Sequence, residues 1–107
     1  MAKYCMISQP MNGLTDEEIL DTKYKASKVV TNAGYEVLNT CFVESFRLNE
    51  DGNPHVNIPV AFLAKAIAVM ARCHAVYFCK GWEKARGCLI EHEIAQKYGI
   101  KCLYEED

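Results

Sequence analysis

A glutamate in the last third of the chain, Glu91, is the residue whose type and setting most directly suggest chemistry. It lies in a helical pattern that follows glycine and charge, within the stretch GWEKARGCLIEHEIAQKYG at residues 81–99. At about 100° per residue, the apolar positions of this helix share one arc: Ile90, Ile94, Ala95 and Tyr98. Glu91 falls inside that arc. A carboxylate there is costly unless it is paired or lines a cleft, so Glu91 is a candidate catalytic group.

Two other interpretations of Glu91 remain open at this point. The side chain lies at the edge of the arc and extends into water, or it accepts a structural hydrogen bond. The opposite face of the helix is expected to meet solvent and carries His92, Glu93, Gln96 and Lys97. Of these, Glu93 and Lys97 have the i, i+4 spacing that favours a surface ion pair.

Strand patterns alternate with helical patterns, and this alternation predicts how the chain positions Glu91. Strands are expected at residues 3–8, 35–38, 75–79 and 100–104, and helices at 16–33, 58–72 and 86–98. The alternation predicts an α/β fold, with a parallel sheet of about four strands in the order 2-1-3-4 and helices on both faces. That order places the topological switch point between the first and third strands, where open α/β sheets bind ligands.

Local signals predict where the helices begin and end and which faces they bury. Thr15 and Glu18 form a capping-box pattern, and Gly34 is the glycine expected after a helix. The inward residues expected on the first helix are Ile19, Ala26, Val30 and Ala33. Those expected on the second are Val60, Leu63, Ala64, Ile67, Ala68 and Ala71. Residues 39–57 are expected to form a long surface loop, because residues 49–54 read NEDGNP.

The loops after the first and third strands are expected to share one crevice with the start of the last helix. These loops cover residues 8–14 and 80–86. Arg86 and Gly87, at the start of that helix, offer backbone N–H groups and the positive end of the helix dipole to a phosphate. Neither loop has the glycine pattern of a dinucleotide-binding site or a P-loop, so generic NTP chemistry is not indicated.

Composition limits the classes of partner. The chain has 107 residues, of which 50% are hydrophobic and 24% charged, which is ordinary for a globular protein and predicts a single domain over residues 1–107. A net charge of −2 gives no reason to expect nucleic-acid binding. No segment is long enough to suggest a membrane span.

Six cysteines are scattered along the chain without a CxxC pair: Cys5, Cys41, Cys73, Cys79, Cys88 and Cys102. Most lie in or beside apolar runs, and the N-terminus has no secretory-signal pattern. We therefore expect reduced, buried thiols in the cytoplasm. The alternative is a zinc site made of Cys73, His74 and Cys79, although this spacing matches no common zinc pattern.

Several of these segments together resemble a known family. The loop Ser8-Gln9-Pro10-Met11-Asn12-Gly13, with Gly81-Trp82-Glu83, Arg86-Gly87 and the helical residues 91–95, is similar to the small nucleoside 2-deoxyribosyltransferase-like proteins, in particular their DUF4406 branch. The resemblance implies a flavodoxin-like or Rossmann-like three-layer sandwich. It also implies homodimers or higher homo-oligomers whose neighbouring subunits complete each site. The implied activity is cleavage or exchange of the N-glycosidic bond of a nucleoside or nucleotide, without a cofactor or metal.

The resemblance also implies roles for individual residues. Gly87, Glu91 and Ala95 hold the family spacing Gly-x-x-x-Glu-x-x-x-Ala, in which the glutamate is the nucleophile. The substrate-binding residues that it implies are Ser8, Gln9, Pro10, Met11, Asn12, Gly13, Gly81, Trp82, Arg86 and Gly87. The loop at 8–13 would meet sugar or base, and the residues at 86–87 would lie near the 5′ side of the sugar. Trp82 either stacks on a base or simply packs against the protein.

The chain departs from the family pattern at five aligned positions. Family aspartates align with Ala66, His74 and Ala85, a family tyrosine aligns with Met6, and a loop glycine aligns with Gln9. The aspartate replaced by Ala66 is the partner of the nucleophile.

Two functions therefore compete at the level of the sequence. One is a deoxyribosyltransferase or N-glycosidase acting through Glu91, for which a replacement acid is sought among Glu44, Glu83, His55 and His74. The other is a catalytically weakened module that binds a nucleotide for sensing or sequestration. The inward Glu91 favours the enzyme, and the loss of the partner aspartate favours the module.

Overall fold

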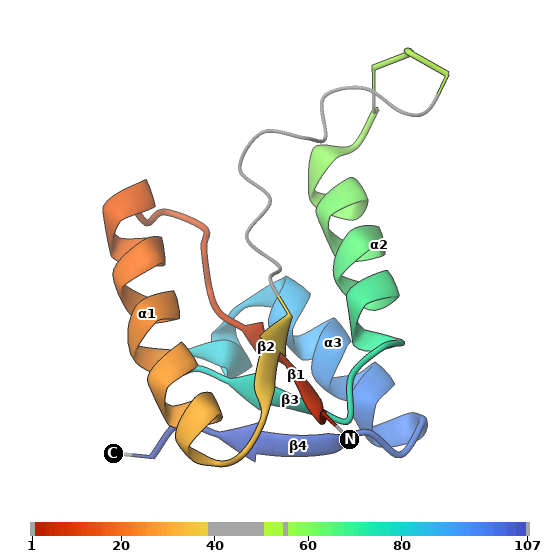
Figure 1. The fold of residues 1–107 in the computed structure, drawn as a ribbon. Coiled ribbons are helices and arrows are strands. Elements are labelled where there is room, and N and C mark those ends of the chain that lie inside the picture. The colour runs from red at the N-terminus through yellow and green to blue at the C-terminus, as the bar shows by residue number, and fades with distance from the viewer. Residues whose placement is uncertain (1, 39–50, 55, 107) are drawn as a thin grey trace.

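Four parallel strands and three α-helices alternate along the chain, as the sequence predicts. The structure is a computed structural model that describes residues 2–38, 51–54 and 56–106. The strands are β1 (Tyr4–Ser8), β2 (Glu36–Leu38), β3 (Ala75–Phe78) and β4 (Lys101–Tyr104). The helices are α1 (Asp16–Asn32), α2 (Ile58–Met70) and α3 (Arg86–Lys97), with a short 3₁₀ turn, η1 (Trp82–Lys84), before α3. The sheet order β2-β1-β3-β4 confirms the predicted α/β fold (Figure 1).

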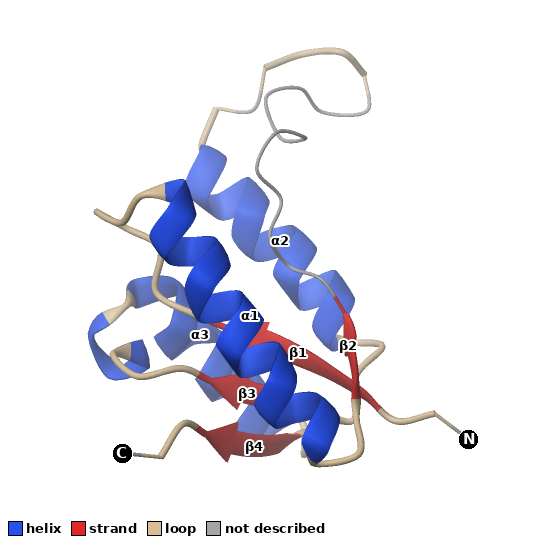
Figure 2. Ribbon diagram, turned by 60° about the vertical axis from the view of Figure 1, so that its left-hand side comes forward, coloured by secondary structure: helices blue, strands red, loops and turns tan. Residues whose placement is uncertain are grey.

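The two central strands are buried on both faces, which explains their continuous apolar runs. Alternate residues of β1 and β3 face opposite helices. One face packs on α1 through Ala26 and Val30, and its strand residues are Cys5, Ile7, Ala75 and Tyr77. The other face packs on α2 and α3, and its strand residues are Met6, Val76 and Phe78. The result is three layers, in which α1 is the one described helix on its side of the sheet (Figure 2).

Most predicted helix boundaries have the expected chemistry. The Thr15 hydroxyl accepts from the Glu18 N–H at 3.1 Å, and Glu18 accepts from the Thr15 N–H, which completes the capping box. Asn57 caps α2 by accepting from the Val60 N–H at 3.1 Å. Gly34 has φ +95°, as expected for a glycine that follows a helix. Within the described part of the chain, no helix combines the length and apolarity needed to cross a membrane.

The prediction for the buried face of α2 is wrong at most of its positions. Val60 is 57% exposed, and Ala64, Ala68 and Ala71 are also exposed. Leu63 and Ile67 are half-buried, and the fully buried residues are instead Ala66 and Met70. The reason is that α2 contains a single charged residue, Lys65, so its apolar pattern does not single out one face. On α1, Ala26 and Val30 are buried as predicted, but Ala33 is exposed because the helix ends at Asn32.

The buried face of α3 is also rotated from the prediction. Its buried residues are Cys88, Glu91 and Ala95, while Tyr98 is 80% exposed. His92, predicted to meet solvent, is half-buried beneath the η1 turn. The predicted surface ion pair forms, with Lys97 Nζ 3.4 Å from Glu93 Oε1.

The predicted loop at 39–57 lies mostly outside the described residues. Of its last residues, Asn57 is the α2 cap, and Gly52 has φ +81° within a turn.

Candidate functional site

The Glu91 carboxyl lies at the carboxyl end of β1, where it accepts a hydrogen bond from Ser8. The Ser8 hydroxyl donates to Glu91 Oε1 at 2.6 Å. Ser8 is the last residue of β1 and pairs with Phe78, the last residue of β3, so the bond lies at the predicted switch point. Its side chain points to the α3 side of the sheet because it lies two residues after Met6. The carboxyl end of β1 and the buried face of α3 therefore meet at Ser8 and Glu91.

Burial makes the charged form of Glu91 unfavourable. The residue is only 9% exposed, so it does not extend into water. Loss of hydration raises the pKa of the Glu91 carboxyl above its ordinary value, and the hydrogen bond from Ser8 acts in the opposite direction. Within the described residues no other carboxylate contributes to this shift. A cleft carboxyl whose pKa is raised by burial is a candidate for a functional group.

Cys88 is a member of this group that the sequence analysis missed. It lies three residues before Glu91 on the same face of α3 and is 4% exposed. Burial raises the pKa of the Cys88 thiol to about 11, a hydrogen bond with Ser8 lowers it, and the charge of Glu91 raises it. The thiol is therefore protonated at neutral pH and does not act as a nucleophile. Its i, i+3 spacing from Glu91 is the sequence signal that could have placed it beside Glu91.

The loops after β1 and β3 approach each other closely. Gly81 has φ +88°, and a Cβ at this position would lie 3.4 Å from the Pro10 ring. Gln9 is buried, and its side-chain amide donates to the Ile19 carbonyl at 2.9 Å, which ties the loop to the first turn of α1. Gln9 therefore braces the loop, while the loop tip beyond it is open to solvent: Met11, Asn12 and Gly13.

The start of α3 carries two of the predicted phosphate-side residues. Arg86 and Gly87 form its first turn, and both are exposed. Ala85 precedes them as the N-cap and makes no side-chain capping bond. The Ala85 side chain therefore does not satisfy the N–H groups of this first turn. These groups lie at the positive end of the helix dipole, which favours an anion. This end of α3 lies one turn before Glu91.

Trp82 packs against a cluster of aromatic rings. Its indole centroid lies 4.2 Å from the His92 ring and 5.4 Å from the Phe78 ring. His92 Nε2 and the Tyr104 hydroxyl share a hydrogen bond of 2.7 Å. This arrangement favours packing over base stacking as the role of Trp82, and it anchors η1 to α3 and β4.

Comparison with protein families shows which family the chain belongs to. A family described as "Domain of unknown function (DUF4406)" matches residues 3–104. The chain belongs to the DUF4406 family. No curated protein and no solved structure matches this DUF4406 protein.

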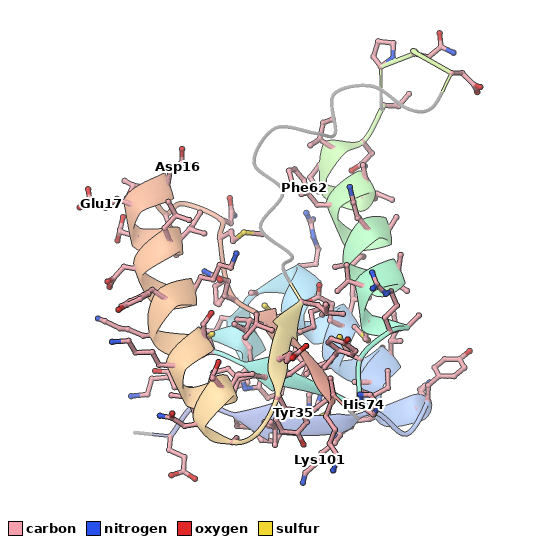
Figure 3. The ribbon with its side chains drawn as sticks, in the orientation of Figure 1. Asp16, Glu17, Tyr35, Phe62, His74 and Lys101 are labelled. Carbon is pink, nitrogen blue, oxygen red and sulfur yellow. The ribbon has the colours of Figure 1, made fainter. Side chains whose placement is uncertain are left out.

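Two residues that the deoxyribosyltransferase resemblance aligns with aspartates, Ala66 and His74, do not supply an acid to Glu91. Ala66 is buried in the apolar layer with Met6 and Phe78. His74 lies at the opposite end of the sheet, close to where β4 begins at Lys101 (Figure 3), and its Nδ1 accepts from the Tyr4 N–H at 3.0 Å. Tyr4 and Ser8 bound β1, so these two sites are separated by about 13 Å of strand.

Of the other proposed replacements, Glu83 is exposed on η1. Glu44 and His55 lie outside the described residues.

The cysteines of the zinc alternative lie at opposite ends of a strand. Cys73 precedes β3 and Cys79 follows it, about 20 Å along the strand, whereas thiolates that share a zinc are within about 5 Å of each other. The described residues contain no group of three potential metal ligands.

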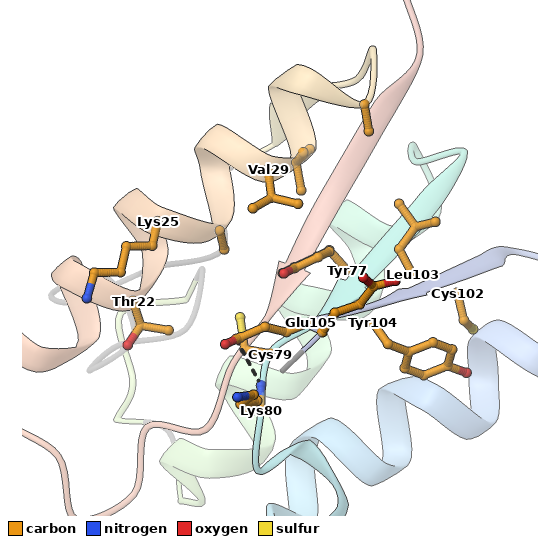
Figure 4. Close-up of a pocket in the computed structure, with 14 residues that line it drawn as sticks. Thr22, Lys25, Val29, Tyr77, Cys79, Lys80, Cys102, Leu103, Tyr104 and Glu105 are labelled. Atoms are coloured by element: carbon orange, nitrogen blue, oxygen red, sulfur yellow. Dashed lines mark hydrogen bonds between the residues drawn. The ribbon is translucent and has the colours of Figure 1, made fainter.

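A large groove lies on the other face of the sheet. It has a volume of about 970 Å³ and lies between α1 and β4, with Val29, Tyr77 and Leu103 in its walls (Figure 4). Of the described helices, α1 is the one that covers this face. Neither Glu91 nor any predicted substrate-binding residue lines the groove, so it is separate from the Ser8–Glu91 pair of this DUF4406 protein.

Proposed function

We propose that this DUF4406 protein cleaves or exchanges the N-glycosidic bond of a nucleoside or nucleotide through Glu91. The observation that carries the proposal is a nearly buried glutamate held by Ser8 at the switch point of a parallel sheet. Its position is the one where α/β proteins act on ligands. The family relationship to nucleoside 2-deoxyribosyltransferases, suggested by the spacing of Gly87, Glu91 and Ala95, is part of this proposal.

The proposed reaction has two steps. In the first, a Glu91 carboxylate oxygen bonds to C1′ of the sugar as the C1′–N bond breaks. The bond's electron pair leaves with the base, which takes a proton from water. In the second, water or another base bonds to C1′ and gives up its proton to the hydroxide that the first step left in solvent. The C1′–O bond to Glu91 breaks, and the carboxylate is regenerated. The negative charge also stabilises the oxocarbenium character of both transition states.

A purely structural role accounts less well for Glu91. A glutamine amide oxygen would accept the same bond from Ser8 without placing a charge in a buried site. The glutamate instead carries a charge whose hydration is lost, as its raised pKa reflects. Groups kept at such a cost are concentrated at functional sites.

The surrounding loops are proposed to hold the substrate. Met11, Asn12 and Gly13 are exposed beyond the Gln9 brace, as a sugar- or base-binding segment requires. Arg86 and Gly87 are proposed to receive a 5′-phosphate at the start of α3, where backbone N–H groups and a guanidinium combine.

The test is release of free base from deoxynucleosides and deoxynucleoside 5′-monophosphates. We expect release by the wild-type protein and a loss of about 1,000-fold or more in Glu91→Gln, because the nucleophile is removed. Glu93→Gln is the matched control, two residues away on the solvent face, and should keep the wild-type rate. Equal rates in wild type and Glu91→Gln would refute the role of Glu91.

A second function is favoured by a specific observation: within the described residues no second carboxylate acts on Glu91. Retaining glycosidases ordinarily use a second acidic group to protonate the leaving group and activate water. A nucleotide-binding module for sensing or sequestration would need none. Calorimetric binding of these nucleotides without base release, by both wild type and Glu91→Gln, would support the module.

The remaining parts of the proposal concern assembly and location. We propose a homodimer or higher homo-oligomer, since α2 exposes apolar residues such as Val60, Ala64 and Ala68. We also propose a cytoplasmic protein, in keeping with the free thiols of the described cysteines.

A further inference from the structure

We propose that Ser8 is a positioning residue: it holds Oε1 of Glu91 and leaves Oε2 as the oxygen that attacks the sugar. This inference rests on the proposed function of Glu91. It gives Ser8 a different role from the substrate contact that the family resemblance implies.

The geometry of Ser8 leaves its hydroxyl little choice of partner. The residue is 2% exposed, and its backbone is fixed in the ladder with β3, where the Cys79 N–H donates to the Ser8 carbonyl at 2.9 Å. A hydroxyl has one proton to donate. That proton goes to Glu91 Oε1 at 2.6 Å, the short distance of a bond to a charged acceptor. Ser8 therefore cannot also donate to a substrate hydroxyl while it holds Glu91.

The bond from Ser8 also restricts the motion of the Glu91 carboxyl group. Glu91 lies on the buried face of α3, so its side chain approaches Ser8 from a fixed helix. Fixing one carboxylate oxygen limits rotation of the other, which favours a reactive orientation.

The first experiment follows the Glu91 carboxyl directly by ¹³C NMR titration of the full chain. We expect Ser8→Ala to raise the Glu91 pKa, because a hydrogen bond to the charged form is lost. Ser8→Thr, which retains the hydroxyl donor, should restore the wild-type titration. Ser27→Ala is the control, since Ser27 lies on α1 across the sheet. An unchanged titration in Ser8→Ala, with the fold intact by circular dichroism, overturns the inference.

The second experiment separates this inference from the proposed function. Using the base-release assay, we expect Ser8→Ala to lower kcat about 10- to 100-fold with KM within about twofold, and to move the pH–rate curve toward higher pH. A rise in KM alone would identify Ser8 as a substrate contact and overturn the inference. If Ser8→Ala shifts the Glu91 titration but the wild type releases no base, the positioning bond stands and the proposed function fails.

Discussion

At the scale of single residues, the charge of the buried Glu91 lowers the stability of the fold. Burial raises its pKa, so the folded protein binds a proton at Glu91 more readily than the unfolded chain does. The unfavourable effect on stability is therefore absent below the unfolded pKa. It grows as the pH rises toward the folded pKa and is constant above it.

We therefore predict that Glu91→Gln is more stable than wild type at pH 7–8, by about 1 kcal/mol, while the two proteins melt alike near pH 4. Thermal unfolding followed by circular dichroism at a series of pH values measures the difference. Glu93→Gln should show no such gain, because its side chain is exposed. A gain that is the same at every pH would show that charge burial is not its cause.

The same raised pKa predicts the pH dependence of the reaction. A nucleophile must be deprotonated, so kcat should rise with pH through the pKa of Glu91 and then level off. Rate measurements between about pH 4 and 9 with saturating deoxynucleotide test this. A rate that instead falls as Glu91 loses its proton would identify Glu91 as a general acid and contradict its role as nucleophile.

At the scale of the elements, the close approach of the two loops depends on Gly81. Its φ of +88° is in the left-handed region, where any other residue is strained, and a Cβ there would lie against the Pro10 ring at 3.4 Å. We predict that Gly81→Ala lowers stability by about 1–2 kcal/mol and weakens nucleotide binding. Gly87→Ala is the contrasting variant, because Gly87 lies in a helical turn with open space around its Cα. It should raise stability by about 0.5 kcal/mol. Urea unfolding gives both values, and equal losses would contradict the prediction.

The aromatic cluster around Trp82 makes a second prediction at this scale. If Trp82 packs as described, Trp82→Ala should cost about 2 kcal/mol or more, and Trp82→Phe should recover most of that stability without changing nucleotide affinity. Thermal melts and calorimetric titration measure the two effects. A Trp82→Phe variant that is stable but binds much more weakly would show that the indole stacks on a base instead.

At the scale of the whole molecule, the exposed apolar face of α2 tests the proposed assembly. We predict that the wild type sediments as a homo-oligomer and that Ala68→Glu shifts it toward monomer, because a charge would enter an apolar interface. Leu20→Glu is the control, because the Leu20 side chain is exposed on α1, and it should leave the assembly unchanged. Wild-type protein that stays monomeric at high concentration would refute the oligomer.

How much of this structure could be predicted from the sequence differs between levels. The Thr15 cap was predictable because a capping box is a local pattern. The sheet order was predictable because alternating strands and helices allow few topologies. The orientation of α2 was not, since a helix that is apolar all round buries whichever face its neighbours cover. Glu91 was identified because one charge interrupts an apolar arc. Its bond to Ser8, 83 residues away, needs the folded sheet to bring the two together.

The position of Trp82 has a practical consequence. It is the sole tryptophan of the chain, and it lies on η1, between the loop after β3 and the start of α3. Its fluorescence therefore reports on this one corner of the molecule with no added label. The imidazole at 4.2 Å is a natural quencher, so any ligand that moves η1 away from His92 should brighten the emission. Nucleotides can be screened in solution by this optical signal before any turnover is known.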